Sequence, residues 1–248
     1  MFSLFTAVEL NNYFDKAVPS SFGFPEDSGG ICLLANNNFF NKVAVALDVT
    51  LDSIEFAASV GAGALVTHHP CIFGKISDIR CDDAVGARLI KAANYGISLM
   101  AYHTRLDNLP GGVNDTLCKI IGIKDTFEFA PCARIGNTEK PATPDNFGAL
   151  VGKALESDRV KVFANNKSVS RVAVCSGSGG SVLRDAYLAG ADTLLTGEVK
   201  YNNELDAAEY GINLIVAGHK ETERIVLPVI KDIILKGFPS AEVFVCYA

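Results

Sequence analysis

The residues best suited to chemistry in this chain are its histidines, of which there are only four in 248 residues. They are His68, His69, His103 and His219. Each stands at or just past the end of an apolar run, where a buried strand would stop. Imidazole is the commonest protein metal ligand, and it titrates near neutral pH. For the adjacent pair alone, a solvated loop is as good an interpretation as a metal or catalytic site.

The first two histidines are neighbours, and this limits where they can act together. Within a strand, successive side chains point to opposite faces of the sheet, so His68 and His69 could not share a site there. Pro70 follows them directly and ends the ladder of hydrogen bonds. At the end of the strand that covers residues 64–67, both rings can turn into one pocket.

Two carboxylates follow histidines at a spacing of four residues. Glu223 stands four residues after His219, and Asp107 stands four after His103. Residues four apart at the start of a helix lie on one face, and Gly218 supplies the turn that aims the His219 pair. Asp107 is expected in a loop, where this spacing carries less information. Taken singly, each of these residues is more simply a cap or loop residue; taken together with the strand ends, they predict metal binding.

The donor types indicate which metals would bind. Imidazole nitrogens with carboxylate oxygens favour a divalent transition ion (zinc, iron, manganese or nickel) over calcium or magnesium. The candidate ligands exceed the needs of one tetrahedral centre, so we expect two ions, about 3.5–4 Å apart, bridged by a carboxylate and a water. Such a pair lowers the pKa of bound water, which makes hydrolysis the natural reaction class.

The elements that position these side chains have an alternating pattern. Buried-type strands are expected at 42–49, 64–67 and 97–102, and helices at 50–60 and 82–95. Strand, helix and strand within so few residues form a βαβ unit, and its parallel sheet must be covered by helices on both faces. In open α/β sheets ligands bind at the C-terminal ends of the strands, where these histidines fall.

The second half of the chain repeats this rhythm, which predicts an α/β fold of two related α/β domains with mostly parallel or mixed sheets flanked by helices. We place the first domain at 1–126 plus 218–248, carrying most of the metal ligands, and the second at 127–217. Residues 137–145 contain two prolines and are expected to be a linker or long turn. The glycine-rich run 176–181 between a strand and a helix could bind phosphate, but a tight turn with close packing is the simpler interpretation.

Composition excludes several function classes. The net charge is −6, with 22 basic and 28 acidic residues, so nucleic acid is an unlikely partner and a small-molecule substrate is expected. The seven cysteines are scattered without a C-x-x-C pair, which is typical of a reducing compartment. We recognise no signal peptide and no membrane span, and therefore predict a cytoplasmic protein with no membrane partner.

At these positions the sequence resembles a known family. The motifs are Leu47-Asp48, Thr67-His68-His69-Pro70, His103-Thr104-x-x-Asp107, Gly112-Val113-Asn114-Asp115, Asp192 with Thr196-Gly197-Glu198, and Gly218-His219-x-x-Thr222-Glu223. In this order they are similar to the YbgI-like family, whose members are also called GTP cyclohydrolase I type 2 homologues or Nif-three-like proteins. The family's usual Trp-Asp-Asn stretch is replaced here by residues 24–30, and the chain contains no tryptophan.

The resemblance implies a dinuclear metal site in the cleft between two related α/β domains, and a ring-shaped homohexamer. By this likeness the metal ligands are His68, His69, Asp107, His219 and Glu223. His103 would stand beside them as a supporting or proton-transferring catalytic residue. The cofactors would be two divalent transition-metal ions.

The leading hypothesis for function is a dinuclear-metal-dependent hydrolase acting on a purine nucleotide, by ring opening like that of a GTP cyclohydrolase. A metal-dependent phosphatase or phosphodiesterase would need the same two ions and is the nearest enzymatic alternative. A different class of function is a non-catalytic, metal-binding ring that acts as a scaffold or regulator.

Overall fold

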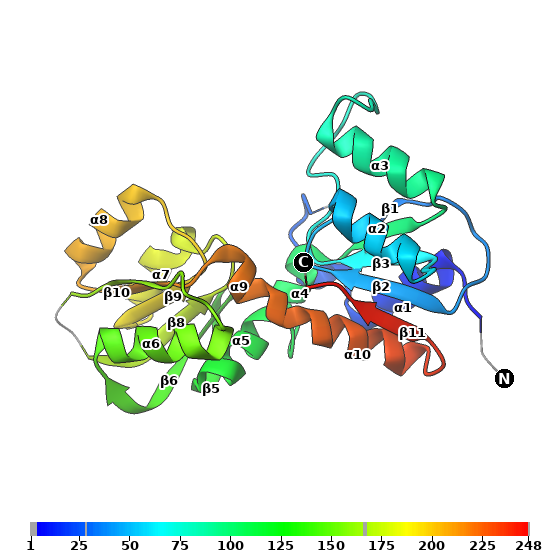
Figure 1. The fold of residues 1–248 in the computed structure, drawn as a ribbon. Coiled ribbons are helices and arrows are strands. Elements are labelled where there is room, and N and C mark those ends of the chain that lie inside the picture. Colours follow the sequence, from blue (N-terminus) through cyan, green and yellow to red (C-terminus); the bar gives the residue numbers. More distant parts are fainter. Residues whose placement is uncertain (1–3, 28, 166–167, 248) are drawn as a thin grey trace. The chain divides into compact units, whose positions relative to one another are not determined.

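The computed structural model describes residues 4–27, 29–165 and 168–247 (Figure 1). The chain divides into two compact units, residues 1–109 with 226–248 and residues 110–225. The boundaries predicted from the sequence lie later in the first half, at 126/127, and earlier in the second, at 217/218. As a result, His219 and Glu223 belong to the second unit, while His68, His69 and Asp107 belong to the first.

The first unit is an α/β sandwich around a five-stranded sheet. Its elements in chain order are α1 (Ala7–Ala17), η1 (Ser20–Phe22), β1 (Gly30–Leu33), β2 (Lys42–Ala46), α2 (Leu51–Ser59), β3 (Ala64–Thr67), α3 (Ala84–Asn94), β4 (Ser98–Ala101), α4 (His103–Asn108), α10 (Leu227–Gly237) and β11 (Glu242–Val245). The strand order is β1-β4-β3-β2-β11, in which β1 is antiparallel and the other strands are parallel.

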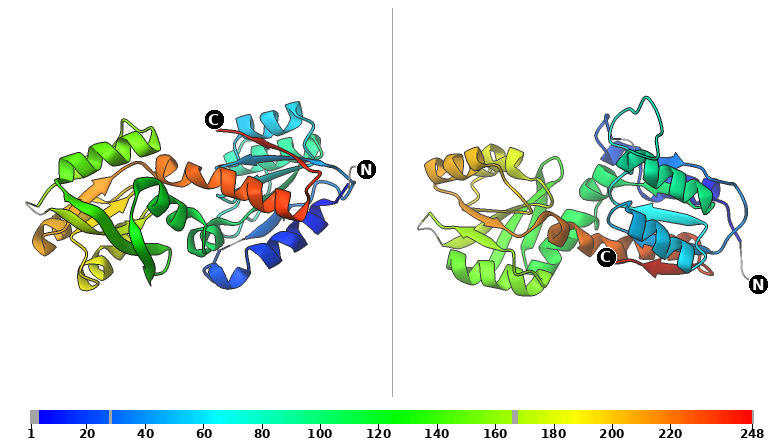
Figure 2. Two further views of the ribbon diagram at one scale, coloured as in Figure 1. Left: turned by 90° about the horizontal axis from the view of Figure 1, so that it is seen from below. Right: turned by 45° about the horizontal axis from the view of Figure 1, so that its top comes forward.

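Alternation along the parallel strands gives this sheet two apolar faces. Ala44, Leu65 and Leu99 face one side, where they pack with apolar residues of α2 and α3. Helices α1 and α10 pack together on the opposite side (Figure 2). Both faces are covered, so β3 is buried along its whole length, and it stops where His68 begins. The predicted βαβ arrangement of residues 42–102 is confirmed.

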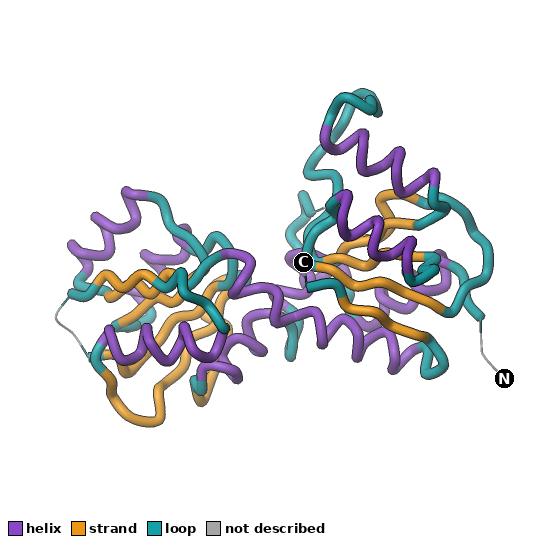
Figure 3. The backbone as a smooth tube through the Cα atoms, in the orientation of Figure 1, coloured by secondary structure: helices purple, strands orange, loops and turns teal. Residues whose placement is uncertain are grey.

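The second unit has the same layered plan around a six-stranded mixed sheet (Figure 3). Its elements in chain order are α5 (Val113–Ile121), β5 (Lys124–Ala130), β6 (Ala133–Ala142), α6 (Pro144–Leu155), β7 (Lys161–Phe163), β8 (Val169–Cys175), η2 (Gly180–Val182), α7 (Leu183–Leu188), β9 (Thr193–Thr196), α8 (Tyr201–Tyr210), β10 (Asn213–Val216), α9 (His219–Glu223) and η3 (Arg224–Val226, whose last residue falls in the first unit). The strand order is β5-β6-β8-β9-β10-β7, with β8, β9 and β10 parallel.

Packing explains why α5 and α9 belong to this second unit. Leu117 and Ile121 of α5 lie in one core cluster with Phe147 of α6 and Val172 of β8. Helix α9 packs against α5. The opposite face of the sheet is covered by α7 and α8 through residues such as Leu183 and Ala207. The two related α/β domains with mixed sheets that the sequence predicted are therefore present, with different boundaries.

One predicted linker is wrong. Residues 137–142 do not form a long turn but continue β6, which pairs with β5 on one side and β8 on the other. The hairpin turns at Cys132, which adopts a left-handed conformation with φ of 55°. Pro141 falls at the irregular end of β6, where the register with β8 shifts, so the sheet tolerates its missing N–H there.

No helix among the described residues is both long and apolar enough to cross a membrane.

Asn114 ties three elements of the second unit together, and this generates a prediction. Its fully buried side chain donates a hydrogen bond to the Cys132 carbonyl (2.9 Å) and accepts one from the Ser176 N–H (2.8 Å). Asn114→Ala should lower the free energy of unfolding by about 2–4 kcal/mol, because both backbone groups lose their partner inside the protein. Chemical denaturation followed by circular dichroism measures this change.

The matched control is Asn202→Ala, since Asn202 is exposed on α8. We expect that change to stay within about 0.5 kcal/mol of wild type. Equal effects of the two substitutions would contradict the assigned role of Asn114.

Candidate metal centre

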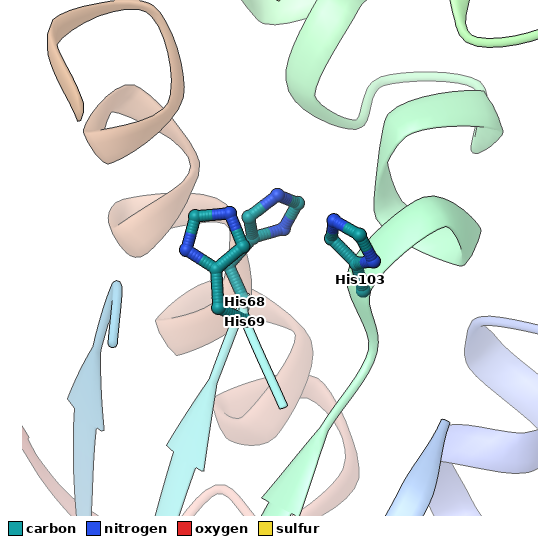
Figure 4. A group of neighbouring side chains, drawn as sticks. All are labelled: His68, His69 and His103. Atoms are coloured by element: carbon teal, nitrogen blue, oxygen red, sulfur yellow. The ribbon is translucent and has the colours of Figure 1, made fainter. Parts of the chain in front are cut away.

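Three histidines of the first unit meet at the C-terminal edge of its parallel sheet. His68 and His69 follow β3, and His103 begins α4 just after the neighbouring β4 (Figure 4). Their ring centroids lie 4.7, 5.2 and 5.3 Å apart. One ring nitrogen from each can be chosen so that all three lie within 4.8 Å of one another. Residues 34 positions apart thus converge because parallel neighbouring strands end at the same edge.

This spacing is near the upper limit for ligands of one transition-metal ion. Two imidazole nitrogens bound at about 2.1 Å to one zinc ion can lie at most about 4.2 Å apart. The ring nitrogens lie within 4.8 Å of one another, so the widest pairs would have to come closer to share one ion. The donor set is nitrogen-rich, as zinc, iron and nickel prefer. His68 is completely buried, so its ring is held in place by packing.

Asp107 lies beside this cluster. Its Oδ1 is 3.7 Å from His68 Nε2, and the residue is buried. Asp107 was expected in a loop, but residues 103–108 form helix α4, so His103 and Asp107 lie one helical turn apart. The cap of this helix explains the difference: Tyr102 at the N-cap offers no side-chain hydrogen bond, and Asp27 from far along the chain accepts the Thr104 N–H instead (2.8 Å).

Two histidines of the first unit have a carboxylate at Nδ1. His69 Nδ1 lies 2.8 Å from Asp48 Oδ1, and His103 Nδ1 lies 3.3 Å from Asp27 Oδ1. An ionised carboxylate can only accept, so Nδ1 carries the proton and Nε2 keeps its lone pair for a metal or a substrate proton. Asp48 belongs to one of the recognised motifs, whereas Asp27 lies in the stretch 24–30 that departs from the family pattern, and neither role was predicted from the sequence.

Asp27 is held ionised by its partners. Burial by itself would raise the pKa of this carboxyl group, but hydrogen bonds from His103, from the Thr104 hydroxyl (2.5 Å) and from the Thr104 N–H outweigh it. The net result is a pKa lowered to about 2. Its negative charge therefore persists across the physiological range and holds the His103 ring.

The second unit places its own pair of predicted ligands together. His219 Nε2 lies 3.1 Å from Glu223 Oε2, on successive turns at the start of α9. His219 Nδ1 lies 3.2 Å from Glu198 Oε1, so this imidazole also has a carboxylate at Nδ1. The hydrogen bond with Glu223 is the main cause that raises the pKa of His219, to about 9, and burial acts against it. In the absence of metal this pair is an imidazolium with a carboxylate.

The glycine-rich turn packs against this pair. A Cβ at Gly177 would lie 2.1 Å from Glu223 Oε1 and 3.2 Å from His219 Nε2, and its φ of +59° is strained for other residues. The Ser176, Gly177 and Gly179 N–H groups donate to the Asn114, Thr222 and Thr196 side chains, respectively. These three donors are engaged within the protein, so the Ser176, Gly177 and Gly179 part of the turn serves close packing.

Comparisons with known proteins agree with this architecture. The family described as Duf34/NIF3 (NGG1p interacting factor 3) matches residues 5–247. A Clostridium perfringens protein named GTP cyclohydrolase 1 type 2 homolog is 27% identical over 96% of this chain and 94% of its own length. A Pyrococcus horikoshii protein of the same name is 28% identical, covering 96% of both chains. The crystal structure of a Bacillus cereus protein related to NIF3 superposes with a TM-score of 0.89 at 20% identity, covering 97% of this chain and 96% of that one.

The His219–Glu223 pair predicts a pH dependence. The pKa of His219 rises from 6.5 to about 9 on folding, so the stability this pair contributes to the metal-free protein is complete below about pH 6.5 and disappears as pH rises through 9. Glu223→Gln should return the pKa of His219 towards 6.5. Ring-proton NMR titration of the metal-free protein measures it.

Glu209→Gln on the exposed side of α8 is the control and should leave the titration unchanged. Because a metal must displace this proton, zinc affinity should increase with pH up to about 9. A His219 titration that is the same in wild type and Glu223→Gln would contradict the pairing.

Asp27 generates a second prediction. Asp27→Asn should release His103 from the Nδ1-protonated tautomer, because an amide can either donate to or accept from the ring. Nitrogen NMR of the imidazoles reports the tautomer directly. We expect the signals of His219 to stay unchanged, and a His103 tautomer unaffected by Asp27→Asn would show that this contact does not control the ring.

Proposed function

Because the chain belongs to the Duf34/NIF3 family, we propose that it is a hydrolase dependent on two divalent transition-metal ions and acting on a purine nucleotide. The proposed metal ligands are His68, His69, Asp107, His219 and Glu223. The resemblance stated from the motif order is confirmed by the family match. The curated relatives carry the name GTP cyclohydrolase 1 type 2 homolog, and this name motivates the choice of substrate.

The observation that best supports the proposal is the convergence of His68, His69 and His103, with ring nitrogens within 4.8 Å of one another, at the ligand-binding edge of a parallel sheet. If the three imidazoles served only packing, nothing would need to fix which ring nitrogen of each carries the proton. Here His69 and His103 each have a carboxylate at Nδ1. Carboxylate–histidine pairs of this kind orient ligands and proton-transfer groups in metalloenzymes.

When bound, the two ions would supply Lewis acidity and a water ionised near neutral pH. His103 is the proposed proton carrier. Its Nδ1–H is held by Asp27, so Nε2 is the atom that accepts or donates a proton at the substrate. The Asp27 charge would stabilise the imidazolium that forms when Nε2 takes up a proton, and the same contact orients the ring.

The proposed oligomeric state and type of substrate follow from the resemblance to the family. We propose a cytoplasmic homohexamer that acts on a small molecule, and the mass of the assembly in light scattering tests the oligomeric state.

Activity profiling of the protein loaded separately with zinc, iron, manganese or nickel tests the reaction. With GTP, we expect the ultraviolet spectrum to change as the purine ring opens, without release of inorganic phosphate. His103→Asn should lower kcat by about 10²–10⁴-fold with the bound metal content unchanged, because it removes the proton carrier. His68→Ala should instead lower the metal content itself.

Two outcomes would replace this proposal. Release of phosphate from phosphoesters without any ring-opened product would identify a metal-dependent phosphatase or phosphodiesterase. Full metal loading with no turnover of either substrate class would favour a non-catalytic scaffold or regulator.

A further inference from the structure

A cavity of about 290 Å³ lies in the first unit directly beside His69. Its wall is built by the start of α2, the loop that follows β3 and the first turns of α3. Besides Asp48, which is hydrogen-bonded to His69, the residues that line it include Thr50, His69, Phe73, Ile76, Val85 and Arg88. It thus joins one of the proposed ligands to residues that the metal centre does not use.

Phe73 gives this cavity an aromatic wall. The side chain is 67% exposed, although its ring centroid lies 5.8 Å from that of His103 and 6.4 Å from that of His69. The ring is edge-to-face with His103, at an interplanar angle of 89°. A large exposed ring next to two imidazoles is positioned for stacking against a planar group, which would remove apolar surface from water.

Arg88 gives the same cavity a positive charge. It lies on α3, is half-buried and takes part in none of the salt bridges that the described residues form. The nearby Arg80, by contrast, is exposed and is paired with Asp82 at 2.6 Å. A guanidinium group without a carboxylate partner, facing a cavity, matches the fork geometry of a phosphate.

We propose that this cavity is the substrate subsite for a phosphorylated heterocycle, with the planar ring stacked on Phe73 and a phosphate bound by Arg88. The inference rests on the proposed function, since it names the groups of the substrate that this unit recognises beside His69 and His103. The volume is just below the usual range for small-molecule pockets, so the cavity would hold a one- or two-ring heterocycle and the phosphate at Arg88, with the rest of the ligand outside.

The absence of tryptophan from the chain makes Phe73→Trp a single fluorescent reporter. Stacking of a base on the indole should quench its emission, saturably, as GTP or guanosine is titrated into the metal-free and the zinc-loaded protein. Phe39→Trp is the matched control, because Phe39 is 65% exposed in the same unit but does not line the cavity. Saturable quenching confined to Phe73→Trp supports the subsite, and equal behaviour of the two variants overturns it.

Arg88 is tested on the same reporter. Arg88→Ala should weaken GTP binding about tenfold or more, because a charge-assisted bond is lost, and should change guanosine binding less than twofold. Arg88→Lys should recover part of the affinity, and Arg80→Ala should have no effect. GTP binding that is unchanged in Arg88→Ala overturns the phosphate assignment.

The experiments can disprove the substrate subsite and the proposed hydrolase function independently of each other. Saturable quenching without any hydrolysis would leave the binding subsite standing and remove the hydrolase. Hydrolysis of GTP with an unchanged KM in Phe73→Ala would leave the hydrolase standing and remove the subsite.

Discussion

The interaction on which the candidate centre depends is the hydrogen bond between a carboxylate and the Nδ1–H of an imidazole. It occurs at His69 with Asp48, at His103 with Asp27 and at His219 with Glu198. An imidazole can bind a metal or take up a proton only through the nitrogen that carries no proton. Each carboxylate therefore decides which nitrogen is available, and it also fixes the plane of the ring.

The carboxylates reach their histidines because of how the two sheets are built. In each unit, parallel strands end at one edge, and the loops from that edge carry both the histidines and the acidic residues. Asp48 follows β2 and meets His69 after β3, whereas Glu198 follows β9 and meets His219 after β10. The same supersecondary relationship, a strand end paired with its parallel neighbour, thus produces a carboxylate–histidine pair in each unit.

The candidate ligands of the first unit and those of the second are held in place by different local causes. Burial of His68 and its neighbours by the sheet and helices fixes the first group, so changes there should act through packing. Close backbone approach shapes the second, because Gly177 leaves the space that the Glu223 carboxylate occupies. Protonation also differs: Asp27 stays ionised, while the metal-free His219 holds a proton up to about pH 9. Metal binding to His219 is therefore coupled to the release of this proton.

The residue types that carry the chemistry, and the approximate ends of the parallel strands, can be predicted from the sequence alone. Buried apolar runs predict strands from local composition, and the end of each run can be read within a few residues. The histidines were therefore placed correctly at strand ends, namely His68, His69, His103 and His219. By contrast, the continuation of β6 through residues 137–142 depends on long-range pairing, because β5 and β8 stabilise this strand from its two sides. The tertiary structure also places α5 and α9 with the second unit through their packing, and makes α4 a helix by supplying Asp27 as its cap. These outcomes depend on contacts between residues far apart in the chain. Such contacts form only when folding brings the side chains together, so a local sequence pattern cannot predict them.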